Sequence, residues 1–264
     1  MQDNRTVLIT GASSGIGYEL AKIFAKNNYN LVLTARNREK LYELKDIIEK
    51  DFNSKIEIIE ADLSEEKSAE SIYNKICARS ISIDVLVNNA GFGTYGNFID
   101  TEIGKTGDMI QVNIASLVKL TKLFLPFLVD SKNGGKILNV ASTAAFQPGP
   151  LMAVYYATKA FVLSFSEALA EELKNTGVTV TALCPGPTQT GFQKTAGIEN
   201  VRLVKTGMVP SAYTVALYGY KAMVKGKRVA VQGFVNRLIV FLLRFAPRRL
   251  VTVVVMLLQE VTKK

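Results

Sequence analysis

Tyr155 and Lys159 have the residue types and the spacing to transfer a proton. They stand four residues apart, and Ser142 lies thirteen positions before Tyr155, at the end of an apolar run. In a helix this spacing places the phenol and the ammonium on one face. A free tyrosine has a pKa of about 10, and a neighbouring Lys⁺ would stabilise the phenolate, which predicts a lowered pKa for Tyr155. Taken alone, however, the pair is more simply explained as two surface residues of an amphipathic helix.

The composition removes whole classes of chemistry. The 264 residues contain no histidine, which excludes Ser-His-Asp catalysis and histidine-bound metals. Two cysteines are too few for a zinc site or a disulfide framework, so we predict no metal site and expect Cys77 and Cys184 to be buried, reduced thiols. An apolar content of 48% with 21% charged residues is that of a globular protein, and the length suits one α/β domain.

The net charge of +9, from 32 basic and 23 acidic residues, predicts an anionic partner. A phosphorylated cofactor and an acidic membrane surface would both exploit this charge. Nucleic acid is disfavoured, because the chain has no long basic run and no interleaved aromatic stripe. The first ten residues lead directly into a strand-like run and leave no room for a signal peptide, so we expect a cytoplasmic protein.

Short apolar segments alternate with amphipathic ones up to residue 185. This alternation is typical of right-handed βαβ units and predicts a parallel sheet covered on both faces. We predict a Rossmann-type, doubly wound α/β domain over residues 1–232, with an apolar C-terminal helical extension over 233–264. The predicted strands are 5–10, 30–35, 55–60, 84–87, 136–141 and 178–184, and the predicted helices are 16–26, 39–50, 65–79, 109–130 and 154–175.

A glycine-rich turn follows the first predicted strand and opens the first helix. Its glycines have the spacing Gly-x-x-x-Gly-x-Gly. They let the turn close tightly and let backbone N–H groups approach a pyrophosphate at the helix N-terminus, where the helix dipole favours negative charge. The alternative is a purely structural turn. The residues predicted to contact a nucleotide here are Gly11, Ser13, Ser14, Gly15, Ile16 and Gly17.

The end of the second predicted strand indicates which nucleotide binds. An NAD-preferring site has Asp or Glu there for the ribose 2′-hydroxyl, whereas this chain has Arg36 and Arg38 and no carboxylate before Glu39. Arg36 can pair with a 2′-phosphate, so we predict NADP(H) in preference to NAD(H). The alternative is that both arginines are solvated residues at a helix start. Asp62 and Leu63 would flank the adenine, although capping of the next helix explains Asp62 equally well.

Further motifs occur in a characteristic order. Residues 88–91 read Asn-Asn-Ala-Gly after the fourth strand, and residues 185–188 read Pro-Gly-Pro-Thr after the sixth. With the glycine turn, Ser142 and the pair Tyr155 and Lys159, they resemble the short-chain dehydrogenase/reductase family, in its compact single-domain branch, over about residues 5–190. Each motif alone is weak, but five in order, each on its expected element, make a strong resemblance.

The resemblance implies roles for individual residues. Tyr155 would be the general acid in carbonyl reduction and the base in the reverse direction. Lys159 would bind the nicotinamide ribose and lower the pKa of Tyr155. Ser142 would hydrogen-bond the substrate oxygen, and Asn113 would keep a water in a proton relay with Lys159. The family spacing selects Tyr155 over Tyr156, which we expect to pack. Further cofactor contacts are implied for Asn89, Ala90, Gly91, Pro185, Gly186, Thr188 and Thr190.

Two segments supply candidates for a substrate cavity. The connection 187–210 is long enough to be a substrate lid with glycine hinges. The candidate linings include no cluster of basic residues, so we expect a hydrophobic ketone, aldehyde or acyl-type substrate. The alternative is that they are ordinary core and loop residues. They are Phe192, Ile198 and Met208 in this connection, and Ala144, Ala145, Phe146, Pro148 and Leu151 after the serine.

The stretch 233–261 is strongly apolar but contains Arg237, Arg244 and Arg248. In a single helix these arginines fall close to one line, because seven and eleven residues nearly complete whole turns. Arginines also leave no uncharged stretch long enough to span a membrane. Three interpretations stay open: an interfacial helix on an anionic membrane, a subunit contact, or a flap over the substrate site. The β-branched run 251–255 could also form a strand.

These observations predict an NADP(H)-dependent oxidoreductase that transfers a hydride between nicotinamide and the carbonyl or alcohol of a hydrophobic substrate. An alternative from another class is an NADP-binding regulatory or sensor protein on the same fold. A sugar-nucleotide epimerase or dehydratase would need a larger C-terminal domain. We expect a homodimer or homotetramer in the cytoplasm, either free or attached to an anionic membrane through 233–261.

Overall fold

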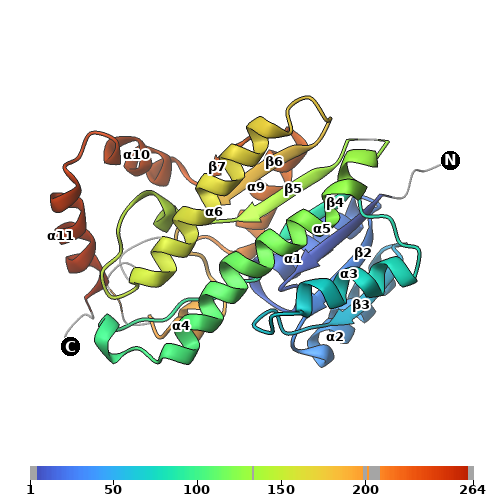
Figure 1. The fold of residues 1–264 in the computed structure, drawn as a ribbon, viewed down its shortest axis with the longest axis horizontal. Helices are drawn as coiled ribbons and strands as arrows, with labels where there is room; N and C mark the ends of the chain where they lie inside the picture. Colours follow the sequence, from blue (N-terminus) through green and yellow to red (C-terminus); the bar gives the residue numbers. More distant parts are fainter. Residues whose placement is uncertain (1–4, 133, 199–200, 202–208, 261–264) are drawn as a thin grey trace.

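A sheet of seven parallel strands forms the centre of the protein (Figure 1). The computed structural model describes residues 5–132, 134–198, 201 and 209–260. The spatial order β3-β2-β1-β4-β5-β6-β7 reverses the direction of winding between β1 and β4. The strands are β1 (Thr6–Thr10), β2 (Asn30–Ala35), β3 (Ile56–Glu60), β4 (Val85–Asn88), β5 (Lys136–Val140), β6 (Thr179–Cys184) and β7 (Val229–Val231).

Two layers of helices cover the sheet. One face carries α1 (Gly15–Lys26), α2 (Arg38–Asp51) and α9 (Ala212–Val224), and the other carries α3 (Ser68–Ala78), α5 (Ser116–Asp130) and α6 (Ala153–Glu172). Val7 and Ile9 of β1 pack in the first core, and Leu8 between them packs in the second. Side chains of a strand alternate between faces, so both faces are apolar. The predicted doubly wound α/β fold is confirmed.

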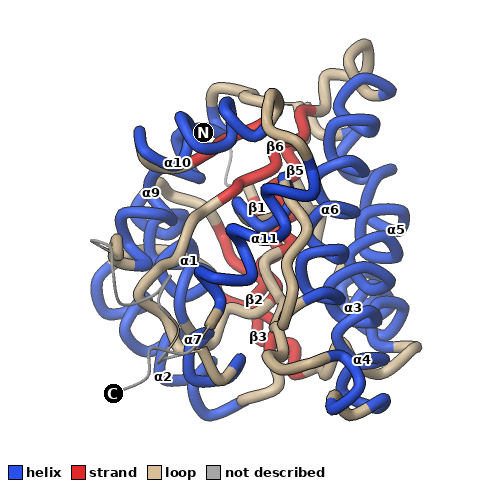
Figure 2. Tube along the Cα trace, turned by 90° about the vertical axis from the view of Figure 1, so that its left-hand side faces the viewer, coloured by secondary structure: helices blue, strands red, loops and turns tan. Residues whose placement is uncertain are grey.

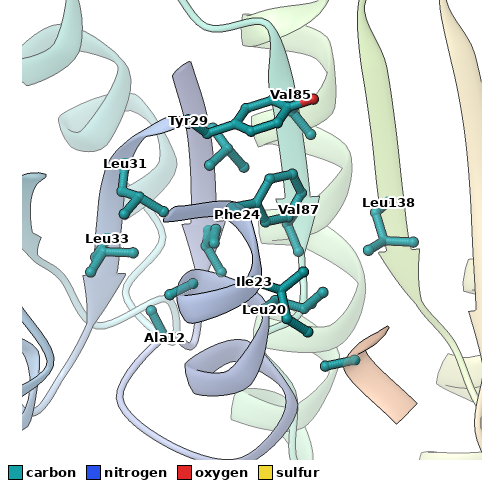
Figure 3. Close-up of a cluster of buried hydrophobic side chains, with 14 of the residues drawn as sticks. Ala12, Leu20, Ile23, Phe24, Tyr29, Leu31, Leu33, Val85, Val87 and Leu138 are labelled. Carbon is teal, nitrogen blue, oxygen red and sulfur yellow. The ribbon is translucent and has the colours of Figure 1, made fainter. Parts of the chain in front are cut away.

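Helix α1 shows how amphipathic spacing builds a layer. Leu20, Ile23 and Phe24 are buried at positions i, i+3 and i+4. Figure 3 shows these side chains directed at the strands that carry Leu31, Leu33, Val85 and Val87. Phe24 also meets Tyr29 edge to face, with ring centroids 5.0 Å apart. Helix α1 is therefore fixed against the sheet, which positions the glycine turn that precedes it.

The sequence analysis did not predict α9, β7 or the short helix α7 (Phe192–Ala196). In α9 the buried residues Val215, Ala216, Gly219, Ala222 and Met223 repeat at helical spacing, so the signal was present in the chain. The predicted helix 109–130 begins earlier, as α4 (Ile103–Ile110), and continues through a π turn (Gln111–Ala115) into α5.

Within the described residues, the helical stretch Ile103–Asp130 is long and apolar enough to cross a membrane by length and composition alone. Its residues Leu120, Phe124 and Leu128 are buried in the second core of the sheet. We therefore interpret this stretch as a core helix, because a helix that packs on a sheet has the same composition.

The C-terminal extension forms two helices, α10 (Phe234–Leu243) and α11 (Arg248–Gln259). The prediction of one continuous helix is wrong, because Pro247 lacks a backbone N–H and disfavours helix at the residue before it. Arg237 and Arg248 consequently lie on different helices and do not form one line. The alternative of a strand at 251–255 is also wrong, since these residues lie within α11.

Only one of the two cysteines is buried. Cys184 ends β6 in the core, and burial raises the pKa of its thiol to about 12. Cys77 is exposed on α3, directly after the buried Ile76, so the prediction of two buried thiols is wrong for Cys77. The residue next to a buried position on a helix turns away from the core.

Candidate active site

The ends of β5 and α6 bring Ser142, Tyr155 and Lys159 together. Ser142 follows β5 and accepts a hydrogen bond from the N–H of Ala144 at 3.1 Å, which caps a short 3₁₀ helix (Thr143–Phe146). Tyr155 and Lys159 lie one turn apart in the first half of α6. The Ser142 hydroxyl donates to the Pro185 carbonyl at 3.5 Å and lies near enough to the Tyr155 phenol to affect its pKa. The Lys159 Nζ lies 5.8 Å from the centre of the Tyr155 ring. The neighbouring Tyr156 is buried, as expected.

The phenol of Tyr155 does not have the lowered pKa that the sequence suggests. Burial raises its pKa above the ordinary value, and the polar Ser142 side chain beside it offsets only part of the rise. The prediction that Lys159 lowers this pKa is therefore wrong for this arrangement. The Lys159 ammonium instead donates to the Val140 carbonyl at 2.8 Å. A phenol with a raised pKa is protonated at neutral pH, which is the state that carbonyl reduction requires of a proton donor.

Lys159 is buried, with 5% of its surface exposed. Burial lowers the pKa of its ammonium to about 8, because a low-dielectric environment disfavours the charged form. The nearby Cys184 acts in the opposite direction and offsets only part of this fall in pKa. The lysine therefore titrates close to neutral pH instead of remaining charged throughout.

Asn113 lies in the π turn before α5 and is 1% exposed. Its side chain accepts from the N–H of Phe92 at 3.1 Å and donates to the Phe92 carbonyl and the Thr158 hydroxyl, both at 3.0 Å. A Cβ at Gly91 would lie 3.0 Å from Asn113 Oδ1 and 3.4 Å from Lys159 Nζ. The amide and the ammonium thus border the same small space above Gly91. Thr158, which the sequence did not single out, links Asn113 to α6.

Gly11 and Gly17 show why the turn requires glycine. Gly11 has a φ of +65°, in the left-handed region that side chains rarely adopt. A Cβ at Gly17 would lie 2.4 Å from the Gly11 oxygen and 2.4 Å from the Asn89 side chain. The start of α1 therefore packs directly on the turn and on the end of β4.

Polar contacts tie β1 to β4 where the winding of the sheet reverses. The Thr10 hydroxyl accepts from the N–H groups of Asn89 and Ala90 at 2.9 and 3.0 Å. The Asn89 side chain donates to the carbonyls of Thr10 and Gly11. Open α/β sheets bind ligands at this reversal, outside the carboxyl ends of the strands.

A cavity of about 960 Å³ begins at this reversal and joins most of the predicted site residues. Gly17 and Asn113 do not line it, because Gly17 packs on Gly11 and the Asn113 side chain is bonded to Phe92 and Thr158. The predicted residues that line it are Gly11, Ser13, Ser14, Gly15, Ile16, Arg36, Asp62, Leu63, Asn89, Ala90, Gly91, Ser142, Tyr155, Lys159, Pro185, Gly186, Thr188 and Thr190.

One end of the cavity is cationic. Arg36 is exposed there, with its guanidinium 3.8 Å from the Asp62 carboxylate. Lys40 and Asn37 also line this end, and the sequence did not single them out; Asn37 caps α2 by accepting from the Lys40 N–H at 2.8 Å. Asp62 accepts from the N–H of Ser64 and does not cap α3, so the capping alternative is wrong.

The other end of the cavity is apolar. Phe192 of α7 (Phe192–Ala196) lies with its ring centroid 5.2 Å from that of Tyr155, and Ile198 and Ala144 also line the wall. Met208 lies outside the described residues. The remaining candidates, Ala145, Phe146, Pro148 and Leu151, do not line the cavity, although their neighbours Gln147 and Met152 do.

Helix α11 closes this apolar end. Val251, Val255 and Gln259 are buried at i, i+4 and i+8 and face the cavity. Gln259 Nε2 donates to the Tyr156 hydroxyl at 2.6 Å, and the Tyr95 hydroxyl donates to the Gln259 carbonyl at 2.7 Å. The inner face of α11 therefore agrees with the interpretation of a flap over the site.

Comparison with known proteins places this fold and site in a family. A model of the short chain dehydrogenase family matches residues 5–200. The match covers well over half of the chain, and the protein belongs to the short-chain dehydrogenase family. A short-chain dehydrogenase from Sphingobium yanoikuyae, solved in complex with NADPH, superposes with a TM-score of 0.80 at 31% identity, over 87% of this chain and 88% of the other.

Two curated relatives indicate the range of chemistry in similar proteins. The 17-beta-hydroxysteroid dehydrogenase type 3 of Mus musculus is 36% identical over 71% of this chain and 61% of its own length. The very-long-chain 3-oxoacyl-CoA reductase of Anas platyrhynchos is 39% identical over 67% of this chain and 58% of its own length. The chain thus spans about three fifths of the length of these two relatives.

Proposed function

We propose that the protein is an NADPH-dependent reductase of bulky apolar carbonyl compounds, acting on a ketone, aldehyde or acyl-type group. The observation that carries the proposal is one cavity with a protonated Tyr155 beside Ser142 at its centre, cations at one end and an apolar wall at the other. The reverse oxidation of an alcohol uses the same groups.

The residues of the chain divide the chemistry between them. The cofactor, when bound, supplies the hydride from its nicotinamide ring. Ser142 holds the carbonyl oxygen and Tyr155 donates a proton to it, so the developing negative charge on the oxygen is neutralised. Lys159, held by the Val140 carbonyl, places a positive charge behind the phenol at and below neutral pH. The roles of Ser142, Tyr155, Lys159 and Asn113 stay predictions until variants are measured.

The residues at the sheet reversal fit a nicotinamide dinucleotide. The left-handed turn at Gly11 lines the cavity where α1 begins, and the close packing at Gly17 holds the start of α1 against this turn. The arrangement supports a pyrophosphate at the N-terminus of α1. Arg36 and Lys40 supply two cations at the far end of the cavity, which supports a 2′-phosphate there and hence NADPH over NADH.

The substrate class follows from the apolar end of the cavity. Phe192, Ile198, Val251 and Val255 surround the space next to Tyr155. Such a wall favours a large apolar group beside the reacting carbonyl. The names of the two curated relatives, a hydroxysteroid dehydrogenase and a very-long-chain oxoacyl reductase, support the same class.

Tyr155→Phe tests the mechanism directly. Removing the phenolic hydroxyl should lower kcat for ketone reduction by about 10²- to 10⁴-fold, because the proton donor is lost. NADPH binding, followed by fluorescence titration, should persist. The measurement is NADPH oxidation with a panel of apolar ketones, aldehydes and acyl thioesters.

Tyr156→Phe is the matched control, because Tyr156 is adjacent and its hydroxyl accepts from Gln259. It should retain most of the activity. Equal rates for wild type and Tyr155→Phe would show that Tyr155 is not the acid. Tight NADPH binding without turnover of any carbonyl would instead support the NADP-binding sensor.

A further inference from the structure

The outer surface of α10 and α11 is apolar and uncovered. Twelve large apolar side chains between residues 234 and 258 are exposed, and the exposed fraction reaches 74% for Phe234 and 73% for Phe245. Figure 2 looks onto this side of the molecule, with α11 across the front. We define the α10–α11 surface by its outward residues Phe234, Leu238, Phe241, Leu242, Phe245 and Leu257.

Helix α10 has no buried residue, although eight of its ten residues are apolar. Burial of apolar area is what normally stabilises such a helix on a protein. Exposed apolar patches of this extent mark sites where another surface docks. The composition of α10 is therefore explained only if something apolar covers it.

The charges of the α10–α11 surface are all positive. Arg237, Arg244, Arg248 and Arg249 are exposed, and the sequence from 233 to 259 contains no Asp or Glu. Within the part of the chain that the structure describes, none of the four arginines pairs with a carboxylate. A two-fold contact of this surface with itself would bring arginines together without an acid to pair them. An anionic lipid surface offers both the apolar phase and the opposite charge.

The cavity opens at the same surface. Ile239, Leu250, Val254 and Leu258 line the cavity and are also exposed, so its rim is continuous with the α10–α11 surface. Figure 1 shows the strands pointing toward the side on which α10 and α11 lie. The mouth and the apolar face thus look in one direction.

We propose that the α10–α11 surface docks on an anionic membrane and that the apolar substrate enters the cavity from the lipid. The docking step stands on the exposed residues alone. The entry step rests on the proposed reductase function, because it assumes that the cavity binds an apolar carbonyl compound.

Vesicle binding tests the docking step and does not require enzyme activity. The full-length protein should co-sediment with vesicles that contain phosphatidylserine, and more weakly with phosphatidylcholine alone. Arg244→Gln with Arg248→Gln should weaken partition onto the anionic vesicles by roughly 10- to 30-fold, since each basic residue near such a surface contributes about 1 kcal/mol. Leu242→Gln with Leu257→Gln should weaken it by roughly tenfold or more.

Matched controls distinguish an effect of the α10–α11 surface on vesicle binding from an effect of the net charge. Lys26→Gln with Lys50→Gln removes the same charge from the ends of α1 and α2 and should leave vesicle binding unchanged. Ile47→Gln removes an exposed apolar side chain from α2 and should also leave vesicle binding unchanged. An equal loss with the lysine pair would reduce the effect to net charge and overturn the proposal. It is also overturned if the wild-type protein ignores anionic vesicles, or if Leu242→Gln with Leu257→Gln only converts a dimer into monomers.

The entry step has its own readout. Leu242 and Leu257 do not line the cavity, so their double variant should keep the wild-type rate with a water-soluble ketone. With a ketone dissolved in anionic vesicles, its apparent KM should rise about tenfold. An equal fall with both substrates would contradict entry from the lipid, whereas absence of all turnover in the wild type would contradict the reductase proposal and leave the binding result intact.

Discussion

At the scale of single residues, Lys159 combines a catalytic position with a cost in stability. Its amine is buried and is held by one carbonyl, so the folded protein binds its proton less tightly than the unfolded chain does. Between the folded pKa of about 8 and the ordinary value of 10.5, the unfolded state carries more protons. The free energy of unfolding therefore rises with pH across this window as far as Lys159 contributes.

Lys159→Met tests this linkage. Relative to the variant, the wild type should gain about 3 kcal/mol of stability from pH 8 to pH 10.5, because folding lowers the pKa of Lys159 from 10.5 to about 8. Denaturant unfolding of both proteins at several pH values measures the difference. A difference that does not change with pH would show that Lys159 has an ordinary pKa. The variant should also lose most of its reductase activity.

Arg36 and Arg38 have the same side chain but different surroundings. Arg36 lines the cavity, whereas Arg38 lies over the Tyr42 ring at 5.4 Å and does not line it. Arg36→Ala should raise the KM for NADPH about 10- to 100-fold and leave that for NADH nearly unchanged, because hydrogen bonds between charged groups contribute about 1.5–3 kcal/mol. Steady-state kinetics with both cofactors checks this.

Arg38→Ala is the control and should have little effect on either KM. If Arg36→Ala weakens NADPH and NADH equally, the arginine does not read the 2′-phosphate. Lys40→Ala should resemble Arg36→Ala in direction, because Lys40 lines the same end of the cavity.

At the scale of secondary structure, helix α11 is attached by two buried valines along its length and by polar contacts at its C-terminal end. Gln259 is 2% exposed and bonds Tyr156 and Tyr95 through its side chain and backbone. Gln259→Ala should leave the buried Tyr156 hydroxyl without its donor, at a cost of about 1–3 kcal/mol. Calorimetry should show a fall of the thermal midpoint of roughly 2–12 °C, and hydrogen exchange should show faster opening of α11.

Thr252→Ala is the control on the same helix, because the Thr252 hydroxyl donates to the Arg248 carbonyl one turn earlier, within α11 itself. It should change neither the opening of α11 nor the KM for an apolar ketone. If Gln259→Ala behaves like Thr252→Ala, α11 is held by its valines and not by this polar contact.

The periodic spacing of apolar residues predicted some secondary-structure elements and contacts but not others. Regular elements such as α1 and β1 were predicted because their apolar spacing is local. Pro247 could also have indicated the break between α10 and α11, but the apolar residues on both sides of it favoured the prediction of one helix. The contact of Gln259 with Tyr156 spans 103 residues, and no pattern in either segment indicates the other.

At the scale of the whole molecule, two sides of the cavity have different character. The end at Arg36 and Lys40 is charged and suits a phosphate, and the end under α11 is apolar and opens beside the α10–α11 surface. Two separate basic regions, one at the Arg36 end of the cavity and one on the α10–α11 surface, thus explain part of the net charge of +9. In this arrangement the cofactor would enter from water and the substrate from lipid, at opposite ends of the cavity. The vesicle experiments test the entry of the substrate.

The sequence by itself determined the family, the alternation of strands and helices up to residue 185, and the position of Ser142, Tyr155 and Lys159. These depend on residue types and on spacing within one element, which fixes the face of a helix or the end of a strand. Only the tertiary structure decided that the Lys159 amine turns to Val140, that Lys40 joins Arg36, and that α11 covers the cavity. Burial and contacts between distant segments set these features, and both arise only when the chain is folded.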